Sequence, residues 1–415
     1  MTGLVPDFLA TFAEFSTFGE RHGGLHRLTL TDEDRQARDR LAELATGAGL
    51  HARVDAIGNQ FFFVAPPDQP ADERPVVMVG SHLDSQPDGG RFDGQVGVVT
   101  ALHAVLALAE RVRSGDYPFN LAVVNWTNEE GARYQPSVLG SSVHTGAVGL
   151  DAALGLVDTA GVVLGDELDR IGYRGSDQVA LPAAYLEVHV EQGPVLEAEG
   201  IDLGVVEGAW AALKLDLTLH GEQTHTGPTP LARRVDAMYA MAQVITLVHE
   251  LGLADPDDRL HTTVGSLGTE PGSPNCTPSR VWAKVELRSD DIDRVRAARQ
   301  RLADELERIE QATGCRAEVT SESLRDVGRM WAPGAELVER VAAAAGLSSR
   351  RMKTIAGHDA VVMNHAVPTV LFFVPAHGGF THNRHEFTTD RDLANGLHAM
   401  VGVLEALPGV EELSC

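Results

Sequence analysis

The stretch GSHLDSQPDGGRFDGQVG, residues 80–97, decides how this chain is expected to fold. It begins where the short apolar run VVMVG (76–80) ends, and an alanine- and leucine-rich segment follows it. An apolar run that ends in glycine is typical of a buried strand, and apolar positions at helical spacing over 94–113 predict a helix. One histidine and three aspartates therefore lie in a loop between a strand and a helix.

The same alternation of apolar strands and helices continues along the chain. Further apolar strands are predicted at 120–126, 184–193 and 368–374, and a helix over 32–50 follows the capping residue Thr31. Strands that are mostly apolar indicate burial on both faces. The expected fold class is therefore α/β, with a mixed, largely parallel sheet flanked by helices.

The middle of the chain has a different pattern. Segments 214–221 and 281–289 alternate apolar and polar residues, as strands with one face in solvent do. We therefore expect residues 210–325 to form a smaller α+β domain, inserted into a main domain made of 1–209 and 326–415.

Composition excludes several classes of protein. The 415 residues carry a formal net charge of −25 without a lysine and arginine cluster, so no nucleic-acid partner is expected. The cysteines Cys276, Cys315 and Cys415 are far apart, which indicates neither a disulfide framework nor a thiolate metal site and fits a reducing cytoplasm. The N-terminus lacks a basic region, and no apolar run reaches about 20 residues, so no signal peptide or membrane span is expected.

Polar residues follow each of the four apolar strands. In chain order they are His82, Asp84 and Asp93; Glu129 and Glu130; His189, Glu191 and Gln192; and His377, His382 and Glu386. Ligands of open α/β sheets bind at the carboxyl ends of strands, so these side chains are expected to converge. Clustered carboxylates repel one another and favour a bound cation, and imidazole with carboxylate suits Zn²⁺, and also Mn²⁺, Co²⁺ or Ni²⁺. Five ligands exceed what one tetrahedral zinc needs, so we expect two divalent ions bridged by an aspartate.

Two kinds of residue in this set are expected to have other tasks. Asp84 lies two residues after His82, on the same side of an extended chain. It is therefore expected to accept a hydrogen bond from the ring nitrogen of His82 that does not bind metal. Glu129 and Glu130 are neighbours whose side chains should point apart, so that one binds metal and the other acts as a general base toward water.

Seven segments carry a resemblance to a known family. They are GSHLDSQPDGGRFDG, NEEGARYQPSVLGSS, LEVHVEQGPVLE, HGEQTHTGPTP, PNCTPSRVWAKVELRS, AGHDAVVM and GGFTHNRHEF. In this order they resemble the two-metal amidohydrolases of the N-carbamoyl-L-amino-acid hydrolase, β-ureidopropionase and allantoate amidohydrolase branch of the aminoacylase/carboxypeptidase superfamily. The resemblance covers nearly the whole chain. It implies a zinc-exopeptidase-like catalytic domain and an inserted domain that serves as a lid and in dimerisation.

The resemblance also implies a role for individual residues. The implied ligands are His82, Asp93 and His189 for one metal, and Asp93, Glu130 and His382 for the other. Glu129 is the implied base. His225 is implied to stabilise an oxyanion in the site of the partner subunit of a homodimer.

The same resemblance suggests how a substrate is held. Gln192, Asn275 and Arg288 match substrate-binding positions, and the planar fork of Arg288 suits a substrate carboxylate. His358, in GHDA at a predicted helix N-terminus, is a further candidate. The chain departs from the family's usual pattern at a few positions that leave every ligand in place. They are RVDA over 234–237, Thr381, Arg384 and His385.

These features together predict a metal-dependent amidohydrolase. We expect it to cleave the carbamoyl C–N bond of an N-carbamoyl-L-α-amino acid, giving the amino acid, ammonia and carbon dioxide. Allantoate, a β-ureido acid and an N-acyl amino acid are alternative substrates. A non-catalytic metal-binding or scaffold protein is the alternative from another class, and the presence of Glu129 with all five ligands argues against it.

Overall fold

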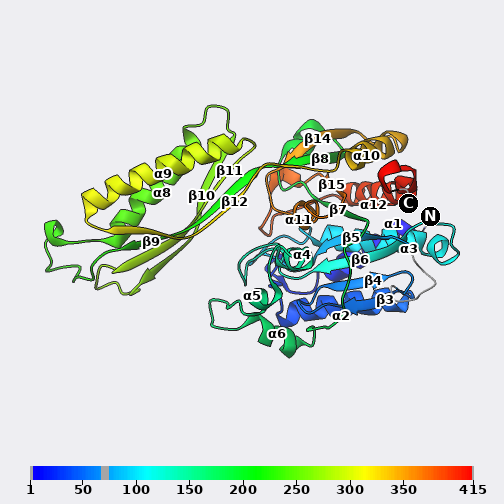
Figure 1. Cartoon of the computed structure of the whole chain (residues 1–415), viewed down its shortest axis with the longest axis horizontal. Helices are drawn as coiled ribbons and strands as arrows, with labels where there is room; N and C mark the ends of the chain where they lie inside the picture. The colour runs from blue at the N-terminus through cyan, green and yellow to red at the C-terminus, as the bar shows by residue number, and fades with distance from the viewer. Residues whose placement is uncertain (1–2, 67–73, 414–415) are drawn as a thin grey trace. The chain divides into compact units, whose positions relative to one another are not determined.

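The computed structural model describes residues 3–66 and 74–413 (Figure 1). Contacts within the chain separate two compact units, Met1–Glu207 with Arg329–Cys415, and Gly208–Gly328. Cys276 and Cys315 are not bridged. Cys415, the third cysteine of the sequence, lies outside the described residues.

A nine-stranded sheet organises the first unit, in the order β13-β8-β15-β7-β5-β6-β4-β3, with β14 beside β8. The four central strands run parallel: β15 (Thr369–Val374), β7 (Ala184–Val190), β5 (Val76–His82) and β6 (Asn120–Trp126). The outer strands are β3 (His51–Val54), β4 (Gln60–Phe63), β8 (Leu203–Ala209), β13 (Gly328–Arg329) and β14 (Ser349–Thr354). β4 and β8 join the parallel group in antiparallel fashion. The mixed, largely parallel sheet predicted from the sequence is confirmed.

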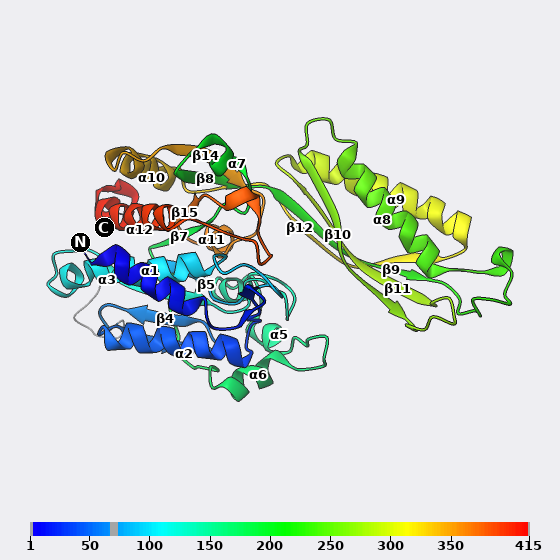
Figure 2. The ribbon, with the colours of Figure 1, turned by 180° about the vertical axis from the view of Figure 1, so that it is seen from behind.

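Helices cover both faces of this sheet (Figure 2). One face carries α1 (Leu4–Phe15), α2 (Asp32–Gly47), α3 (Gln95–Arg113), α10 (Ala332–Ala344) and α12 (Asp390–Ala406). The other side carries the shorter helices α4 (Leu139–His144), α7 (Val195–Glu199) and α11 (Asp359–Met363). The helices α5 (Leu150–Leu154) and α6 (Leu164–Ile171) pack beside α4 in a separate small cluster. α2 begins where the sequence places it, because the side chain of Thr31 accepts a hydrogen bond from the N–H of Asp34.

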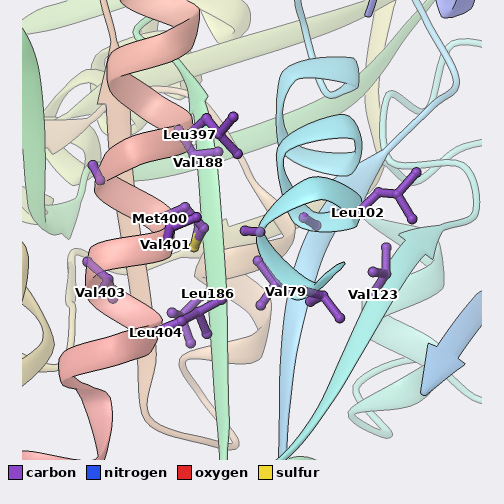
Figure 3. Packing of buried hydrophobic residues seen from close by; sticks show 14 of the residues in the cluster. Val79, Leu102, Val123, Leu186, Val188, Leu397, Met400, Val401, Val403 and Leu404 are labelled. Atoms are coloured by element: carbon purple, nitrogen blue, oxygen red, sulfur yellow. The ribbon is translucent and has the colours of Figure 1, made fainter. Parts of the chain in front are cut away.

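Alternate residues of the central strands supply two separate cores. On β5, Val77 and Val79 join the core formed with α3 and α12, whereas Met78 belongs to the core on the opposite face. Figure 3 shows side chains of α12, among them Leu397 and Leu404, packed toward β7. Burial on both faces explains why the sequence of these strands is mostly apolar.

α3 is the one helix of the described residues with the length and hydropathy to cross a membrane. Within its apolar window, 78% of the residues are buried inside the unit. The helix packs on β5 and β6 and against α12. Its apolar composition therefore follows from its place in the core of the first unit.

The second unit is a four-stranded antiparallel sheet with two helices on one face. In spatial order the strands are β10 (Leu260–Glu270), β11 (Arg280–Ser289), β9 (Ala211–His220) and β12 (Arg316–Arg325). The helices are α8 (Ala237–Leu253) and α9 (Ile292–Thr313). Along β11, buried residues alternate with more exposed ones, and the buried residues face the helices. A sheet with one covered face accounts for the alternating pattern of the sequence.

A close approach between α3 and the sheet holds the loop of residues 83–94 in place. α3 begins directly after this loop, and its third residue is Gly97. A Cβ on Gly97 would lie 2.4 Å from the Cβ of Ser81 and 2.8 Å from the carbonyl oxygen of Val188. Only glycine lets the helix approach β5 and β7 this closely.

We predict that Gly97→Ala destabilises the protein by about 1–3 kcal/mol or more, because the added methyl group overpacks the contact between α3 and the sheet. Gly47→Ala is the matched control, since Gly47 is also helical and no atom lies within 4 Å of its added Cβ. That control should change stability by no more than about 1 kcal/mol, in the stabilising direction. Urea unfolding of both variants measures the difference. Equal midpoints would contradict the close approach.

Candidate active site

His82, the last residue of β5, has one ring nitrogen fixed and the other directed at carboxylates. Its Nδ1 donates to the main-chain oxygen of Asp84 at 2.9 Å. Its Nε2 lies 3.5 Å from Oδ1 of Asp93 and 3.4 Å from Oε2 of Glu129. This nitrogen is buried and finds no hydrogen-bond partner among residues 3–66 and 74–413. A ring held through one nitrogen, with the other free and facing carboxylates, has the arrangement of a metal ligand.

The glycine before α3 is required by the His82 ring. Gly94 has a φ of +64°, and a Cβ there would lie 2.4 Å from Cε1 of His82. Any larger residue would displace the imidazole or the loop. The glycine-rich composition of residues 80–97 therefore serves to bring the loop against the ring.

Asp93 lies among three histidines. Its Oδ1 is 3.0 Å from Nε2 of His189, and its Oδ2 is 3.2 Å from Nε2 of His382. The same nitrogen of His382 is 3.3 Å from Oε2 of Glu130. Two groups that could each hold a metal ion result, one of His82, Asp93 and His189 and one of Asp93, Glu130 and His382. They share Asp93.

The parallel order of the four central strands explains this convergence. His82 ends β5, Glu130 follows β6, His189 lies near the end of β7, and His382 follows β15. These strands are neighbours that point the same way, so their carboxyl ends meet at one edge of the sheet. The structure thus brings together the five predicted ligands.

The charges of this cluster compensate one another only in part. Burial acts to raise the pKa of Asp93, but His189, His382 and His82 hold that pKa well below its usual value. Burial raises the pKa of Glu130, and the negative charge of Asp93 raises it further. Burial also acts to lower the pKa of His382, yet Glu130 and Asp93 raise it to about 9. Divalent cations would take the place of these imidazolium protons, which is the chemistry this donor set fits.

Asp84 has a different task from the one that the sequence predicts. Its nearest carboxylate oxygen is 3.7 Å from Nδ1 of His82, because the main-chain oxygen of Asp84 takes that hydrogen bond. The carboxylate instead accepts from the N–H groups of Glu129 and Glu130, at 3.2 and 3.3 Å. The prediction was wrong about the atom, since spacing along the chain does not distinguish a side-chain acceptor from a main-chain one. Asp84 links the His82 turn to the loop after β6.

Glu129 and Glu130 lie in a bend after β6, and their carboxylates have different neighbours. Gln86 fixes Glu130 by donating from its main-chain N–H at 3.1 Å and from Nε2 at 2.9 Å. Glu129 faces His82 and belongs to neither of the two ligand groups. Burial raises its pKa well above the usual range for a glutamate.

Glu386 is a site residue whose task the sequence did not assign. It is 4% exposed, and its Oε1 accepts from the N–H groups of Phe92 and Asp93, at 2.8 and 3.0 Å. It also fills the space over Gly90, where a Cβ would lie 2.1 Å from Oε1. Glu386 thus orients the segment that carries the shared ligand. The available signal was its place after the fourth apolar strand, close to His382.

Gln192 lies beside the shared ligand. Its Nε2 donates to Oδ2 of Asp93 at 2.6 Å and is 3.5 Å from Nε2 of His382. Thr381 also donates to Oδ2 of Asp93, at 3.3 Å. This oxygen therefore has protein donors in addition to His382. The substrate contact expected of Gln192 stays a prediction.

His358 is almost fully buried and packs edge-on against His189, with ring centroids 4.5 Å apart. These two residues form a third candidate group with Glu187. The carboxylate of Glu187 already accepts from Oγ of Ser81 at 2.7 Å and from the N–H of Ala360 at 2.8 Å. Because the carboxylate of Glu187 is already hydrogen-bonded, we interpret Glu187 and His358 as residues that support His189.

Two of the predicted residues of the second unit lie close together. Residues 225 and 276 form a bridge, and the N–H of Thr226 donates to the carbonyl oxygen of Asn275 at 3.2 Å. Arg234, the first residue of RVDA, donates to the main-chain oxygen of Thr226 at 2.6 Å. The segments of His225 and Asn275 are therefore neighbours.

Arg288 lies at the other end of the same sheet. His225 lies shortly after the end of β9. At that end, His220 pairs with Arg280, the first residue of β11. Arg288 is eight residues further along β11, a distance of about 26 Å in an extended strand. It forms an ion pair of 2.8 Å with Glu286. Within one chain, Arg288 and the segment of His225 therefore lie at opposite ends of this sheet.

Comparison with known proteins identifies the family. Residues 78–406 match the model of peptidase family M20/M25/M40. The chain belongs to this family. The N-carbamoyl-L-amino-acid amidohydrolase of Rhizobium meliloti is 36% identical over 94% of this chain and 93% of its own length. The allantoate amidohydrolase of Bacillus subtilis is 31% identical over 97% of each chain.

A solved structure agrees with these relatives. An amidase of the hydantoinase/carbamoylase family from Burkholderia vietnamiensis has a TM-score of 0.89 and 33% identity, over 96% of each chain. The family prediction and the prediction of an amidohydrolase are confirmed. The peptidase M20 family is metal-dependent, and the two ligand groups around Asp93 fit a binuclear centre.

We predict that the purified protein contains up to two divalent ions per chain and that chelation abolishes its activity. Asp93→Asn should lower the content of both ions, because this residue belongs to both ligand groups. Asp88→Asn, an exposed change in the same loop, is the matched control and should leave the metal content unchanged. Inductively coupled plasma mass spectrometry measures the ions. A full complement in Asp93→Asn would exclude the shared-ligand site.

Proposed function

We propose that this member of the M20 family hydrolyses the carbamoyl C–N bond of N-carbamoyl-L-α-amino acids. The observation that carries the proposal is the position of Glu129, a buried carboxylate beside two ligand groups and part of neither. A carboxylate so placed can take a proton from water. The choice of substrate is supported by the relative from Rhizobium meliloti, which bears this name.

The proposed reaction divides its tasks among residues of both units. When bound, two divalent cations would polarise the ureido carbonyl and acidify the attacking water. Glu129 accepts the proton of that water as it adds to the ureido carbon, and then returns the proton to the leaving nitrogen. His225 stabilises the negative oxygen of the tetrahedral species. The end products are the amino acid, ammonia and carbon dioxide.

Glu129→Gln should keep its metal and lose most of its turnover, because the amide cannot accept the proton. Removal of a general base commonly lowers kcat by about 100- to 10,000-fold. Glu130→Gln is the matched control, since the same change at a ligand position should lower metal content as well. Steady-state kinetics with metal analysis separates the two. A kcat close to wild type in Glu129→Gln would assign the base to another group.

Allantoate is the second candidate substrate, and the 31% identity to the allantoate amidohydrolase of Bacillus subtilis favours it. Both candidates carry a carboxylate and a ureido group. A panel of N-carbamoyl amino acids, N-acyl amino acids, a β-ureido acid and allantoate ranks them by kcat/KM. Highest kcat/KM with allantoate would overturn the choice of N-carbamoyl amino acids and leave the amidohydrolase chemistry unaffected.

Arg288 is proposed to bind the carboxylate of the substrate. The chain is strongly acidic, and its repulsion of an anion is largely screened beyond about 8 Å at physiological salt. Capture of a carboxylate therefore needs a local cation of suitable geometry. Arg288 keeps a side chain that is 25% exposed and offers a planar fork of donors.

Arg288→Ala should lower kcat/KM for a carboxylate substrate by roughly 10- to 150-fold, the effect of losing a charge-assisted contact worth about 1.5–3 kcal/mol. Arg288→Lys should also be poor, because lysine lacks the bidentate fork. The loss should shrink with the matching neutral amide substrate. An equal loss with both substrates would show that the arginine is structural.

A homodimer is proposed to complete the site. The span of about 26 Å along β11 separates Arg288 from the His225 and Asn275 segments of the same chain. Two subunits could supply the two ends to one site, with His225 and Asn275 from the partner. The second unit offers an edge strand, β10, and exposed apolar side chains on α8, among them Met238 and Tyr239. Both features favour association with another chain.

Hybrid dimers test this arrangement. A His225→Ala chain mixed with a Glu129→Gln chain should regain part of the activity, because one of the two sites then contains both intact residues. Native mass spectrometry of differently tagged chains verifies the heterodimer. Heterodimers that stay inactive would place His225 in the site of its own subunit.

A further inference from the structure

The proposed base lies in a strained loop. Residues 127–138 connect β6 to α4 and include Glu129. Asn128 has a φ of +57° and Val138 a φ of +51°. A positive φ costs free energy for a β-branched residue such as valine. Residues keep this backbone conformation only where surrounding contacts hold them in it. The conformation of the loop therefore depends on contacts outside it.

Val138 fixes the backbone of Glu129 directly. Its N–H donates to the carbonyl oxygen of Glu129 at 2.6 Å, and the next N–H, of Leu139, donates to Asn128 at 3.2 Å. Val138 is also the residue from which α4 begins. Any shift of the first turn of α4 would thus move the backbone that carries the base.

The first turn of α4 is tied to α11 by a buried hydrogen bond. Oγ of Ser141 donates to Oδ1 of Asp359 at 2.5 Å and lies 3.2 Å from the carbonyl oxygen of Val138. Both Ser141 and Asp359 are fully buried. The second carboxylate oxygen, Oδ2, has no hydrogen-bond partner in the described part of the chain. A fully buried carboxyl group with one oxygen lacking a hydrogen-bond partner is uncommon in folded proteins and is a reason to look for a specific task.

Asp359 is itself fixed to the strands that carry metal ligands. It begins α11, and the N–H of the next residue, Ala360, donates to Glu187 on β7 at 2.8 Å. Glu187 also accepts from Oγ of Ser81 on β5 at 2.7 Å. The chain of contacts therefore runs from β5 and β7 through α11 to α4.

We propose that Asp359 is a positioning residue for Glu129, acting through Ser141 and Val138. The inference rests on the proposed role of Glu129 as the base. Asp359 belongs to none of the candidate ligand groups, and the hydrogen-bonded route from it to Glu129 runs through the loop. Its charge also acts to raise the pKa of Glu129 directly, and Ser141→Ala separates this effect from the route through the loop. A well-ordered base matters because a misplacement of about 1 Å can cost a factor of about 100 in rate.

Four variants and one control test the proposal: Asp359→Ala, Asp359→Asn, Ser141→Ala, the double variant Ser141→Ala/Asp359→Ala, and Ser142→Ala. Asp359→Ala and Ser141→Ala should each lower kcat by about 10- to 100-fold, with KM and metal content unchanged. The double variant should be no worse than either single one. Asp359→Asn keeps an acceptor for Ser141 and should recover part of the loss. Ser142→Ala changes the neighbouring hydroxyl of the same helix and should retain wild-type kcat.

A crystal structure of Ser141→Ala supplies a readout independent of turnover, and it should show Val138 leaving its positive φ. Wild-type kcat in Ser141→Ala and Asp359→Ala, with only a lower melting temperature, would overturn the proposal. The proposal would also be overturned if kcat fell as far in Asp359→Asn as in Asp359→Ala while Ser141→Ala kept a kcat near wild type. The charge of Asp359 would then act on the reaction without Ser141. Glu129→Gln is measured in parallel. If that variant keeps its turnover, the proposed function fails; if it loses turnover while Ser141→Ala does not, only this inference fails.

Discussion

The site depends on the compensation of charge around Asp93. A carboxylate buried at the edge of a parallel sheet is stable only if cations or donors surround it. Here three imidazoles approach its two oxygens, and Gln192 adds a donor. The same arrangement would let Asp93 serve as a ligand of both metal ions. The segment that carries this carboxylate is held close to its neighbours by three glycines: Gly97 against the sheet, Gly94 against His82 and Gly90 against Glu386.

Buried carboxylates also act as clamps on the main chain around this centre. Asp84 accepts from the N–H groups of Glu129 and Glu130, and Glu386 accepts from those of Phe92 and Asp93. Each clamp joins the ends of different strands. A main-chain N–H group is fixed by the backbone, so these bonds orient the following side chains more firmly than contacts between flexible side chains could. The two hydrogen bonds that each group receives offset only part of the cost of burial, which raises the pKa of both Asp84 and Glu386 to about 7.

The two units contribute different chemistry. The first unit holds every metal-ligand candidate and the proposed base, whereas the second holds His225, Asn275 and Arg288. The antiparallel sheet of the second unit is long enough to keep Arg288 far from the other two residues. In the proposed homodimer, the two ends of this sheet would belong to different sites. The formal net charge of −25 would repel an anionic substrate at long range, which is why a local contact with Arg288 is proposed.

The sequence alone determined the α/β fold, the strand ends and the five candidate ligands, because apolar runs and the residues after them are local features. Tertiary structure decided which atoms meet. The spacing of residues along the chain predicted the wrong hydrogen-bond acceptor for His82. It also gave no sign that Glu386 would contact Asp93, a residue 293 positions away. The bond between Ser141 and Asp359, which are 218 positions apart, is of the same kind. Such contacts arise when separate strands and helices pack, so no local pattern encodes them.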